Sequence, residues 1–416
     1  MKKMSEHFFQ SNRKRLGEKL KPSSAVVLFS GKAPKKSADE DYAFTTNRHF
    51  YYMCGVKEPD IMLLILKVQE EVKTTLFIKK PDPWQEKWVG KTISKEDALT
   101  VSGVDEVKFV EEFEGTLHYL LSREMVKHLY LDFEYSHFQA PLTKEQVFAG
   151  TCRERYPFIQ VENVHPLISA LRMIKAPYEV DRIKEAIRIT DEGIKALMRE
   201  ARSGIREYAL EAHFDFVLKC AGVKDYAFKT IAASGINGTV LHYSSNDSII
   251  PEQSLILFDL GAQYEYYNAD ISRTFPVEGR FTSRQKTFYN IVLKANEEVI
   301  QAIKPGLPFM RLNEIVREIY FKELKALGLV ETMEDVSKYY YHGVSHFLGL
   351  DTHDVGEREV VLEPGMVLTV EPGLYIEEEA IGIRIEDDVL VTPEGCEVLS
   401  KDIIKTAEEI EAYMQA

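Results

Sequence analysis

The sequence of 416 residues has little of several features that would define its class. Only four cysteines are present, and no two of them form a CxxC pair. Their spacing argues against a disulfide framework or a thiolate zinc site and favours a reducing compartment. The chain also has only 23 glycines and 16 prolines, which excludes collagen-like and low-complexity classes.

Long hydrophobic runs are missing as well. The longest run near the front, residues 61–66, is far shorter than the ~20 residues that span a bilayer. Residues 1–10 lack the apolar core of a signal peptide. A net charge of -14 makes nucleic acid an unsuitable partner. We therefore expect a soluble cytoplasmic protein that binds neither membranes nor nucleic acids.

Common catalytic motifs are absent too, namely GxGxxG, GxxxxGK[ST], GxSxG and HExxH. The charge is unevenly distributed. Residues 1–175 carry 27 basic against 24 acidic side chains, whereas residues 176–416 carry 25 against 42. The surplus carboxylates could bind hard cations or attract an ammonium group. Charge alone is explained more simply by a solvated acidic surface.

The first part of the chain alternates short apolar segments with helix-like segments, which predicts an α/β domain with a mixed sheet. The predicted strands cover residues 25–29, 62–68, 74–78 and 129–133, and the predicted helices cover 95–100 and 113–123. Pro177 then opens a helix that has acidic residues in its first turn. We place the domain boundary near residues 166–176 and assign residues 1–170 and 171–416 to two domains.

The second part predicts an α+β domain with a strongly bent antiparallel sheet. Its predicted helices cover residues 177–202, 208–220, 283–303 and 308–326, and its predicted strands cover 254–260, 268–275, 367–376 and 382–391. Two strand pairs, each near long helices, indicate a duplicated helix-plus-hairpin unit. The similarity between the two halves is too weak to prove a repeat.

Four carboxylates lie in or beside these strands. Asp259 ends one strand and Asp270 lies in the next, so an antiparallel hairpin would bring them together. Like charges side by side destabilise a sheet unless a cation separates them, although two edge aspartates would explain this pair alone. Glu371 and Glu386 are embedded in apolar strands, where a carboxylate is rarely buried without a partner.

Three of the 11 histidines, His342, His346 and His353, lie within twelve residues of one another. This clustering indicates a site, although His342 could equally make a structural hydrogen bond. Four carboxylates and one imidazole form an oxygen-rich set suited to manganese or another hard divalent ion. Because the set exceeds what one ion needs, two bridged ions are expected, and paired ions support hydrolysis.

The motifs that carry these residues resemble those of one family. They are Asp259–Gly261, Asn268–Thr274, His342–Asp354, Val370–Tyr375 and Gly382–Asp387. Together they resemble the pita-bread metallopeptidases, which include methionine aminopeptidase, prolidase, aminopeptidase P and creatinase. The resemblance implies a catalytic domain with a pseudo-twofold bent antiparallel sheet. Asn47–Gly55 is similar to the N-terminal domain of aminopeptidase P, and Thr230–Gly238 is closest to the bacterial form.

The resemblance also implies a ligand set for two divalent ions, most simply manganese. Asp259 would hold the first ion, and Asp270 and Glu386 would bridge the two. His346 and Glu371 would complete the coordination of the second ion. A hydroxide between the ions would attack the carbonyl of the residue that precedes proline.

Further roles follow from the same resemblance. Glu371 would shuttle a proton to the leaving imino nitrogen. His242 and His353 would orient the substrate and stabilise the oxyanion, and Arg384 would support a metal ligand.

The implied activity is that of a manganese-dependent Xaa-Pro aminopeptidase, acting on peptides with proline at the second position. The nearest alternative is prolidase, which cuts only Xaa-Pro dipeptides. A non-catalytic peptide-binding module is a third possibility, but such domains typically lose ligands. The family implies a homodimer or homotetramer, in which Trp84 or Trp88 would either reach a neighbouring cleft or pack as ordinary aromatics. The preferred first residue stays open.

Overall fold

The computed structural model describes residues 2–134 and 137–416. The chain forms two compact units, Met1–Arg172 and Met173–Ala416. Each unit has its own sheets and its own apolar core. None of the helices in the described part of the chain combines the length and apolar character that crossing a bilayer requires.

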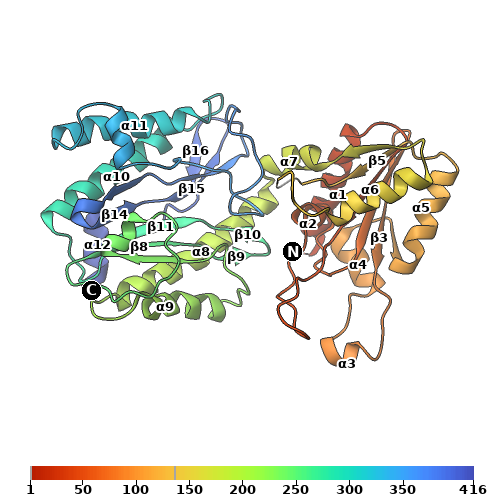
Figure 1. Cartoon of the computed structure of the whole chain (residues 1–416), viewed down its shortest axis with the longest axis horizontal. Helices are drawn as coiled ribbons and strands as arrows, with labels where there is room; N and C mark the ends of the chain where they lie inside the picture. The colour runs from red at the N-terminus through yellow and green to blue at the C-terminus, as the bar shows by residue number, and fades with distance from the viewer. Residues whose placement is uncertain (1, 135–136) are drawn as a thin grey trace. The chain divides into compact units, whose positions relative to one another are not determined.

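The first unit is built on a six-stranded mixed sheet with the order β4-β3-β2-β1-β5-β6 (Figure 1). β2 pairs antiparallel with β1 and β3, whereas β4, β5 and β6 join through parallel pairings. This confirms the predicted α/β domain with a mixed sheet. The strands are β1 (Ser24–Phe29), β2 (Met62–Val68), β3 (Glu71–Ile78), β4 (Glu106–Phe109), β5 (His128–Leu131) and β6 (Gln160–Asn163).

Helices accompany this sheet, and those predicted at residues 95–100 and 113–123 are confirmed as α4 and α5. The helices are α1 (Lys2–Lys19), α2 (Arg48–Cys54), α3 (Glu86–Val89), α4 (Lys95–Ser102), α5 (Phe113–Ser122), α6 (Lys144–Arg155) and α7 (His165–Met173), with the 3-10 turn η1 (Val110–Glu112). α7 ends one residue beyond the boundary between the units.

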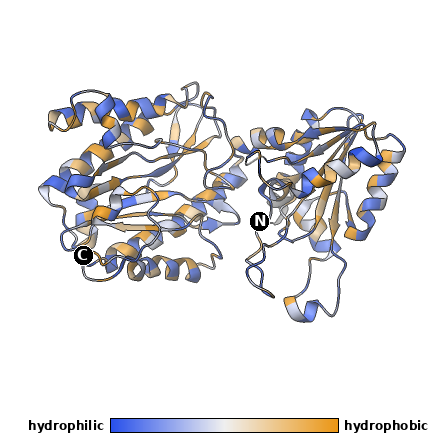
Figure 2. Cartoon of the chain, in the orientation of Figure 1, coloured by the Kyte–Doolittle hydropathy of each residue, from blue (hydrophilic) through white to orange (hydrophobic). Residues whose placement is uncertain are grey.

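The core of the first unit forms because its central strands are apolar on both faces. All six residues of β1 are buried, as expected for a strand covered on both sides. Val27 and Phe29 pack in one cluster with Leu117 of α5 and Leu129 of β5. Figure 2 shows the same division, with hydrophobic residues concentrated on the strands and hydrophilic ones on the helix surfaces.

The second unit places short antiparallel sheets between two helix pairs, α8 with α9 and α10 with α11 (Figure 1). Its helices are α8 (Pro177–Glu200), α9 (Glu207–Cys220), α10 (Ser283–Ala302), α11 (Arg311–Ala326) and α12 (Ala407–Met414), with the 3-10 turns η2 (Gly235–Thr239), η3 (Glu334–Lys338) and η4 (Glu377–Glu379). The predicted α+β domain is confirmed.

Two three-stranded sheets, β11-β8-β7 and β12-β15-β16, lie next to the hairpins β9-β10 and β13-β14. The strands are β7 (Ile231–Ser234), β8 (Leu255–Leu260), β9 (Gln263–Tyr264), β10 (Tyr267–Asn268), β11 (Ile271–Pro276), β12 (Val367–Val370), β13 (Gly373–Ile376), β14 (Ile381–Arg384), β15 (Asp387–Val391) and β16 (Cys396–Val398). α8 and α9 contact the first sheet, and α10 contacts the second.

The last three strands predicted from the sequence are each interrupted, and the prediction of continuous strands was wrong there. The breaks fall at Asp270, Glu371 and Glu386, so that each predicted strand becomes two, β10 with β11, β12 with β13 and β14 with β15. Pro372 follows Glu371 and cannot donate to a ladder. The carboxylates therefore lie where the chain leaves one sheet and enters another.

Candidate metal centre

One cavity of about 710 Å³ in the second unit is lined by every residue that the sequence singled out for a site role. These residues are His242, Asp259, Asp270, His346, His353, Glu371, Arg384 and Glu386. They come from strands, strand breaks and loops that are separated by up to 144 positions in the chain. The fold therefore assembles them into one place.

The first two carboxylates are positioned by a hairpin, as the sequence predicts. β8 and β11 pair antiparallel, with Asp259 opposite Ser272 and Leu260 opposite Ile271. Asp270 lies one residue before this ladder, and its backbone N–H donates to Asp388 Oδ2 at 3.2 Å. Asp270 is buried, and Asp259 is partly buried.

Glu386 is joined to this hairpin by two hydrogen bonds. Its backbone N–H donates to the carbonyl oxygen of Ser272 at 3.1 Å. The Ser272 hydroxyl donates to Glu386 Oε2 at 2.8 Å. Ser272 thus connects the first sheet to the strand break that carries Glu386, and it fixes the distance between carboxylates from the two halves of the unit.

His346 presents one ring nitrogen to the carboxylates. Its Nδ1 lies 3.0 Å from the carbonyl oxygen of Phe347, so this nitrogen carries the hydrogen. Nε2 then has a lone pair, and it lies 3.3 Å from Asp270 Oδ2 and 3.6 Å from Glu371 Oε1. A lone pair that faces two carboxylates is unfavourable by itself, and a cation between them removes the conflict.

The carboxylates repel one another's charge in the absence of a cation. Burial, and then the charges of neighbouring carboxylates, hold the pKa of Asp270 and of Glu386 well above their ordinary values. Burial also raises the pKa of Glu371 to about 7, and Asp259 adds to the effect against His346 and Arg384. Burying a charged carboxylate without a partner costs several kcal/mol, so the cluster as built requires positive charge.

Two oxygens in the cluster are left without a hydrogen bond among the described residues. Asp259 Oδ1 and Glu386 Oε1 are both buried and unpartnered. One atom each from Asp270, His346 and Glu386 also lie within 4.8 Å of one another. Carboxylate oxygens with one imidazole form the donor set that hard divalent ions bind. The residues therefore fit divalent metal ions.

Arg384 supports this cluster with three directed hydrogen bonds, and its side chain is buried. Nη2 donates to Asp259 Oδ2 at 2.6 Å, Nε donates to the Ser272 hydroxyl at 2.9 Å, and Nη1 donates to the Tyr375 hydroxyl at 2.9 Å. One planar guanidinium thus orients a carboxylate and the serine that holds another.

The other histidines differ in their surroundings. The ring centroid of His353 lies 4.4 Å from that of His346 in an edge-to-face arrangement. His342 donates from Nδ1 to the carbonyl oxygen of Gly343 at 2.8 Å and accepts at Nε2 from the Tyr375 hydroxyl at 2.9 Å. Burial, with the charge of Arg384, lowers the pKa of His342 to about 4. His342 is therefore a neutral, doubly hydrogen-bonded residue in the cavity wall.

Sequence reasoning missed Ser272, Tyr375 and Glu207. Ser272 shares its strand face with Asp270 under a period of two, and this signal could have found it. Glu207 is fully buried on α9 and accepts hydrogen bonds from Ser234, Asn237, Tyr243 and Ser248. It thereby fixes the loop that carries His242, and no local pattern indicates this role.

Arg273 ties the back of the centre to the end of the chain. Its guanidinium is fully buried and contacts Asp387 at 2.8 Å. It also donates to the carbonyl oxygens of Ile403 and Ile404. Lys405 Nζ adds an ion pair with Asp387 at 2.8 Å. These contacts hold the strand next to Glu386 against the segment that precedes α12.

The two three-stranded antiparallel sheets of the second unit and the buried, oxygen-rich cluster define a metal-dependent hydrolase of the pita-bread type. The model of metallopeptidase family M24 matches residues 181–393, and the model of the aminopeptidase P N-terminal domain matches residues 9–130. The chain belongs to metallopeptidase family M24.

Three similar proteins indicate which members of this family the chain resembles. The Xaa-Pro aminopeptidase of Escherichia coli is 34% identical over 437 residues, which cover 100% of this chain and 99% of that protein. A solved structure assigned as an aminopeptidase P from Bacillus anthracis is 53% identical, with a TM-score of 0.97 over 99% of this chain and 98% of its own. The human Xaa-Pro dipeptidase is 30% identical over 98% of this chain and 93% of its own length.

Proposed function

We propose that this enzyme is a Xaa-Pro aminopeptidase, which removes the first residue of a peptide when proline is second. The observation that carries the proposal is the convergence of four carboxylates and His346 in one cavity of a chain that matches the E. coli Xaa-Pro aminopeptidase from end to end. A non-catalytic module is disfavoured because the chain belongs to a peptidase family and retains every predicted ligand.

The proposed ligand assignment is the one that the family resemblance implies, and the proximity of Asp270, His346 and Glu386 supports it. Asp259 would bind one ion, His346 and Glu371 would bind the other, and Asp270 and Glu386 would bind both. When bound, two divalent ions activate water for attack and polarise the peptide carbonyl. The oxygen-rich donor set favours manganese over softer ions.

The remaining steps belong to protein side chains. Glu371 accepts the proton of the attacking water and delivers it to the imino nitrogen of proline, as a general base and then a general acid. His242 and His353 donate to the carbonyl oxygen as negative charge develops on it. Phe309 and Phe347 line the cavity with stacked rings, 5.3 Å between centroids, and offer an apolar surface for the proline ring.

A comparison of two substrates tests the proposal. The enzyme is incubated with a Xaa-Pro dipeptide and a Xaa-Pro-Xaa tripeptide, with manganese and after chelation, and a tripeptide with alanine in second place is the control. We expect manganese-dependent release of the first residue from the proline tripeptide. This release should be faster than cleavage of the dipeptide or of the alanine tripeptide. Cleavage of the dipeptide alone would assign prolidase activity, and no cleavage of either substrate with manganese would overturn the proposal.

Metal content provides an independent measurement. We expect two divalent ions per chain at the catalytic centre, and full loss of activity on chelation. An enzyme that is fully active with no more than one bound ion at this centre would contradict the two-ion assignment.

Two properties of the whole protein complete the proposal. All four cysteines are free thiols, which supports a cytoplasmic location. Trp84 and Trp88 are 68% and 77% exposed, which supports a role in assembly into a homodimer or homotetramer. Light scattering of the purified protein measures the assembly directly.

A further inference from the structure

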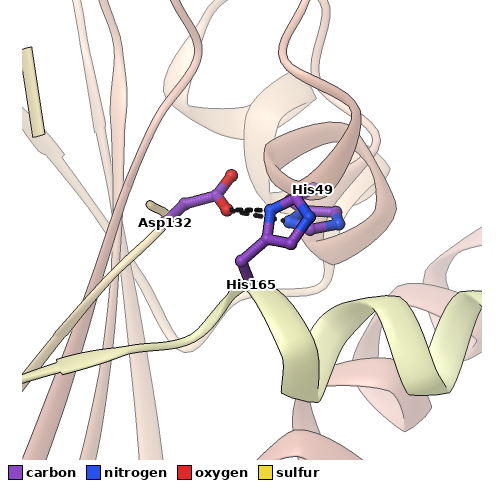
Figure 3. A group of neighbouring side chains, drawn as sticks. All are labelled: His49, Asp132 and His165. Carbon is purple, nitrogen blue, oxygen red and sulfur yellow. Dashed lines mark hydrogen bonds and ion pairs between the residues drawn. The ribbon is translucent and has the colours of Figure 1, made fainter. Parts of the chain in front are cut away.

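A second cluster of metal-binding side chains lies in the first unit and takes no part in the proposed reaction. His49, Asp132 and His165 meet through a single carboxylate oxygen (Figure 3). Asp132 Oδ1 lies 3.1 Å from His49 Nδ1 and 2.9 Å from His165 Nδ1. The two imidazole rings lie with their centroids 4.5 Å apart.

The fold brings these residues to one edge of the six-stranded sheet. Asp132 follows the last residue of β5, and His165 opens α7 two residues after β6 ends. β5 and β6 are parallel, so their carboxyl ends lie together. In open α/β sheets, ligands bind outside the carboxyl ends of the strands. His49 reaches the same edge from α2.

Two asparagines hold the cluster in place. Asn163 Oδ1 accepts from the backbone N–H of Phe133 at 3.1 Å and of His165 at 3.0 Å, and thus links the chain next to Asp132 to the start of α7. Asn47 caps α2 and donates from Nδ2 to Asp132 Oδ2 at 3.4 Å. Such outer hydrogen bonds preorganise ligands in metal sites.

The spacing of the three atoms is close to that of a tetrahedral site, with Asp132 Oδ1 slightly nearer to both nitrogens. Zinc binds histidine nitrogen and carboxylate oxygen at about 2.0–2.2 Å, which places neighbouring ligand atoms about 3.3–3.6 Å apart in a tetrahedron. The three ligand atoms of the cluster lie within 4.8 Å of one another. An ion could therefore enter after the carboxylate oxygen moves by a fraction of an ångström.

Burial and neighbouring charges determine how an ion reaches this cluster and how tightly the cluster would bind it. The side chains of His49 and Asp132 are 2% and 8% exposed, whereas that of His165 is 25% exposed and leaves a route for water. Burial lowers the pKa of His49, so its ring is a neutral donor. The hydrogen bond with Asp132 raises the pKa of His165, and the charge of Glu134 adds to this effect. The positive charge of Arg172 lowers the pKa of both histidines and opposes a cation.

We propose that His49, Asp132 and His165 bind one divalent ion of the zinc class, with water at the exposed side of His165 as the fourth ligand. Two imidazoles and one carboxylate suit zinc, cobalt or nickel better than the harder ions of the catalytic centre. On binding, His165 keeps a single hydrogen, on Nε2, and releases any second ring proton to water, and the Nδ1 proton of the His49 ring moves to Nε2 of that ring. This atom is buried and unpartnered among the described residues, and together with Arg172 it limits the affinity to a moderate value.

The test counts zinc on the full chain. Wild type, His165→Ala and Asp132→Asn are stripped with a chelator and dialysed against the same buffered zinc concentration, and bound zinc is measured by elemental analysis. The matched control is His128→Ala, which removes another histidine that contacts a carboxylate in the same unit, Glu162 at 3.3 Å. We expect both cluster variants to hold one zinc equivalent fewer than wild type and the control.

Two further arms keep the result independent of the catalytic centre and of folding. The same His165→Ala change in an Asp270→Ala background should again remove one equivalent. His165→Gln, which keeps much of the volume of this partly buried side chain, should do the same with an unchanged circular dichroism spectrum. Peptide cleavage by the manganese-loaded His165 variants should stay within about twofold of wild type. Equal zinc counts in wild type and in the folded variants His165→Ala, Asp132→Asn and His165→Gln would show that the three residues form a hydrogen-bonded cluster without a metal, and would overturn the proposal.

Discussion

Arg384 Nη2 lies 2.6 Å from Asp259 Oδ2, in the wall of the cavity that the carboxylates line. The same guanidinium also donates to Ser272 and Tyr375. Lysine would keep the positive charge but could not make all three bonds, because its ammonium has no planar fork. The shape of the Arg384 guanidinium, and not only its positive charge, therefore sets the orientation of Asp259.

We predict that Arg384→Lys lowers kcat/KM on a Xaa-Pro tripeptide by roughly ten- to hundredfold, the usual loss when a residue that orients a metal ligand is changed. Manganese affinity should fall in parallel. Steady-state kinetics and metal titration measure both quantities. Unchanged values in the lysine variant would show that charge alone matters at this position.

Glu371→Gln tests the proton transfer. Glutamine keeps one coordinating oxygen and the size of the side chain but cannot accept and release a proton. We predict a loss of kcat of about a hundredfold or more, with a melting temperature at or above that of wild type because a buried charge is removed. The control is Glu363→Gln, at an exposed position. Near-normal turnover by Glu371→Gln would remove this residue from the chemistry.

His242→Ala, His353→Ala and Asp270→Ala separate substrate contacts from metal ligands. Loss of one donor to an oxyanion costs roughly 10²–10³ in kcat, so both histidine variants should keep their metals and lose most of kcat/KM. Asp270→Ala should lose the metals. His213→Ala on α9 is the control. If His353→Ala lost both ions, His353 would be a ligand and the assignment of His346 would be wrong.

The pH dependence of stability can be assigned in part to Glu179. Burial raises the pKa of this carboxyl in the folded chain to about 7, from an ordinary value of 4.5. Between these values the unfolded chain releases a proton that the folded chain keeps, so stability falls as pH rises from 4.5 to 7 and stays reduced above that. The shift corresponds to about 3 kcal/mol.

Glu179→Gln should remove this contribution. We expect the free energy of unfolding, measured with urea at pH 5 and pH 8, to change less with pH in this variant than in wild type. Asp181→Asn, at an exposed position in the same helix, is the control and should follow wild type. An identical pH dependence in wild type and Glu179→Gln would contradict the assignment.

The sequence predicted the hairpin of Asp259 and Asp270 because both strands are short apolar runs that end near a glycine. It did not predict the breaks at Glu371 and Glu386. The apolar runs around these residues look continuous. Local propensity does not show that contacts with a distant carboxylate cluster interrupt the strand pairing at these positions. The period of two marks the strand face of Ser272, but its bond to Glu386 joins the two halves of the unit and depends on tertiary contacts.

The cluster of His49, Asp132 and His165 in the first unit shows this limit of sequence-based prediction more clearly. His49 lies 83 positions from Asp132, and Asp132 lies 33 positions from His165. Their meeting depends on the placement of β5 between β1 and β6. Hydrophobic periodicity predicts strands but leaves their order in the sheet undetermined, so these three residues could not be grouped before the fold was known.

The contacts of Arg273 with Asp387, Ile403 and Ile404 have a consequence for the biosynthesis of the enzyme. Arg273 lies beside the first carboxylates, but its partners Asp387, Ile403 and Ile404 follow 114 to 131 positions later in the chain. A nascent chain therefore cannot complete these contacts until residue 404 has left the ribosome. A chain that terminates between residues 388 and 402 would keep the ion pair of Arg273 with Asp387 but lose its hydrogen bonds to Ile403 and Ile404.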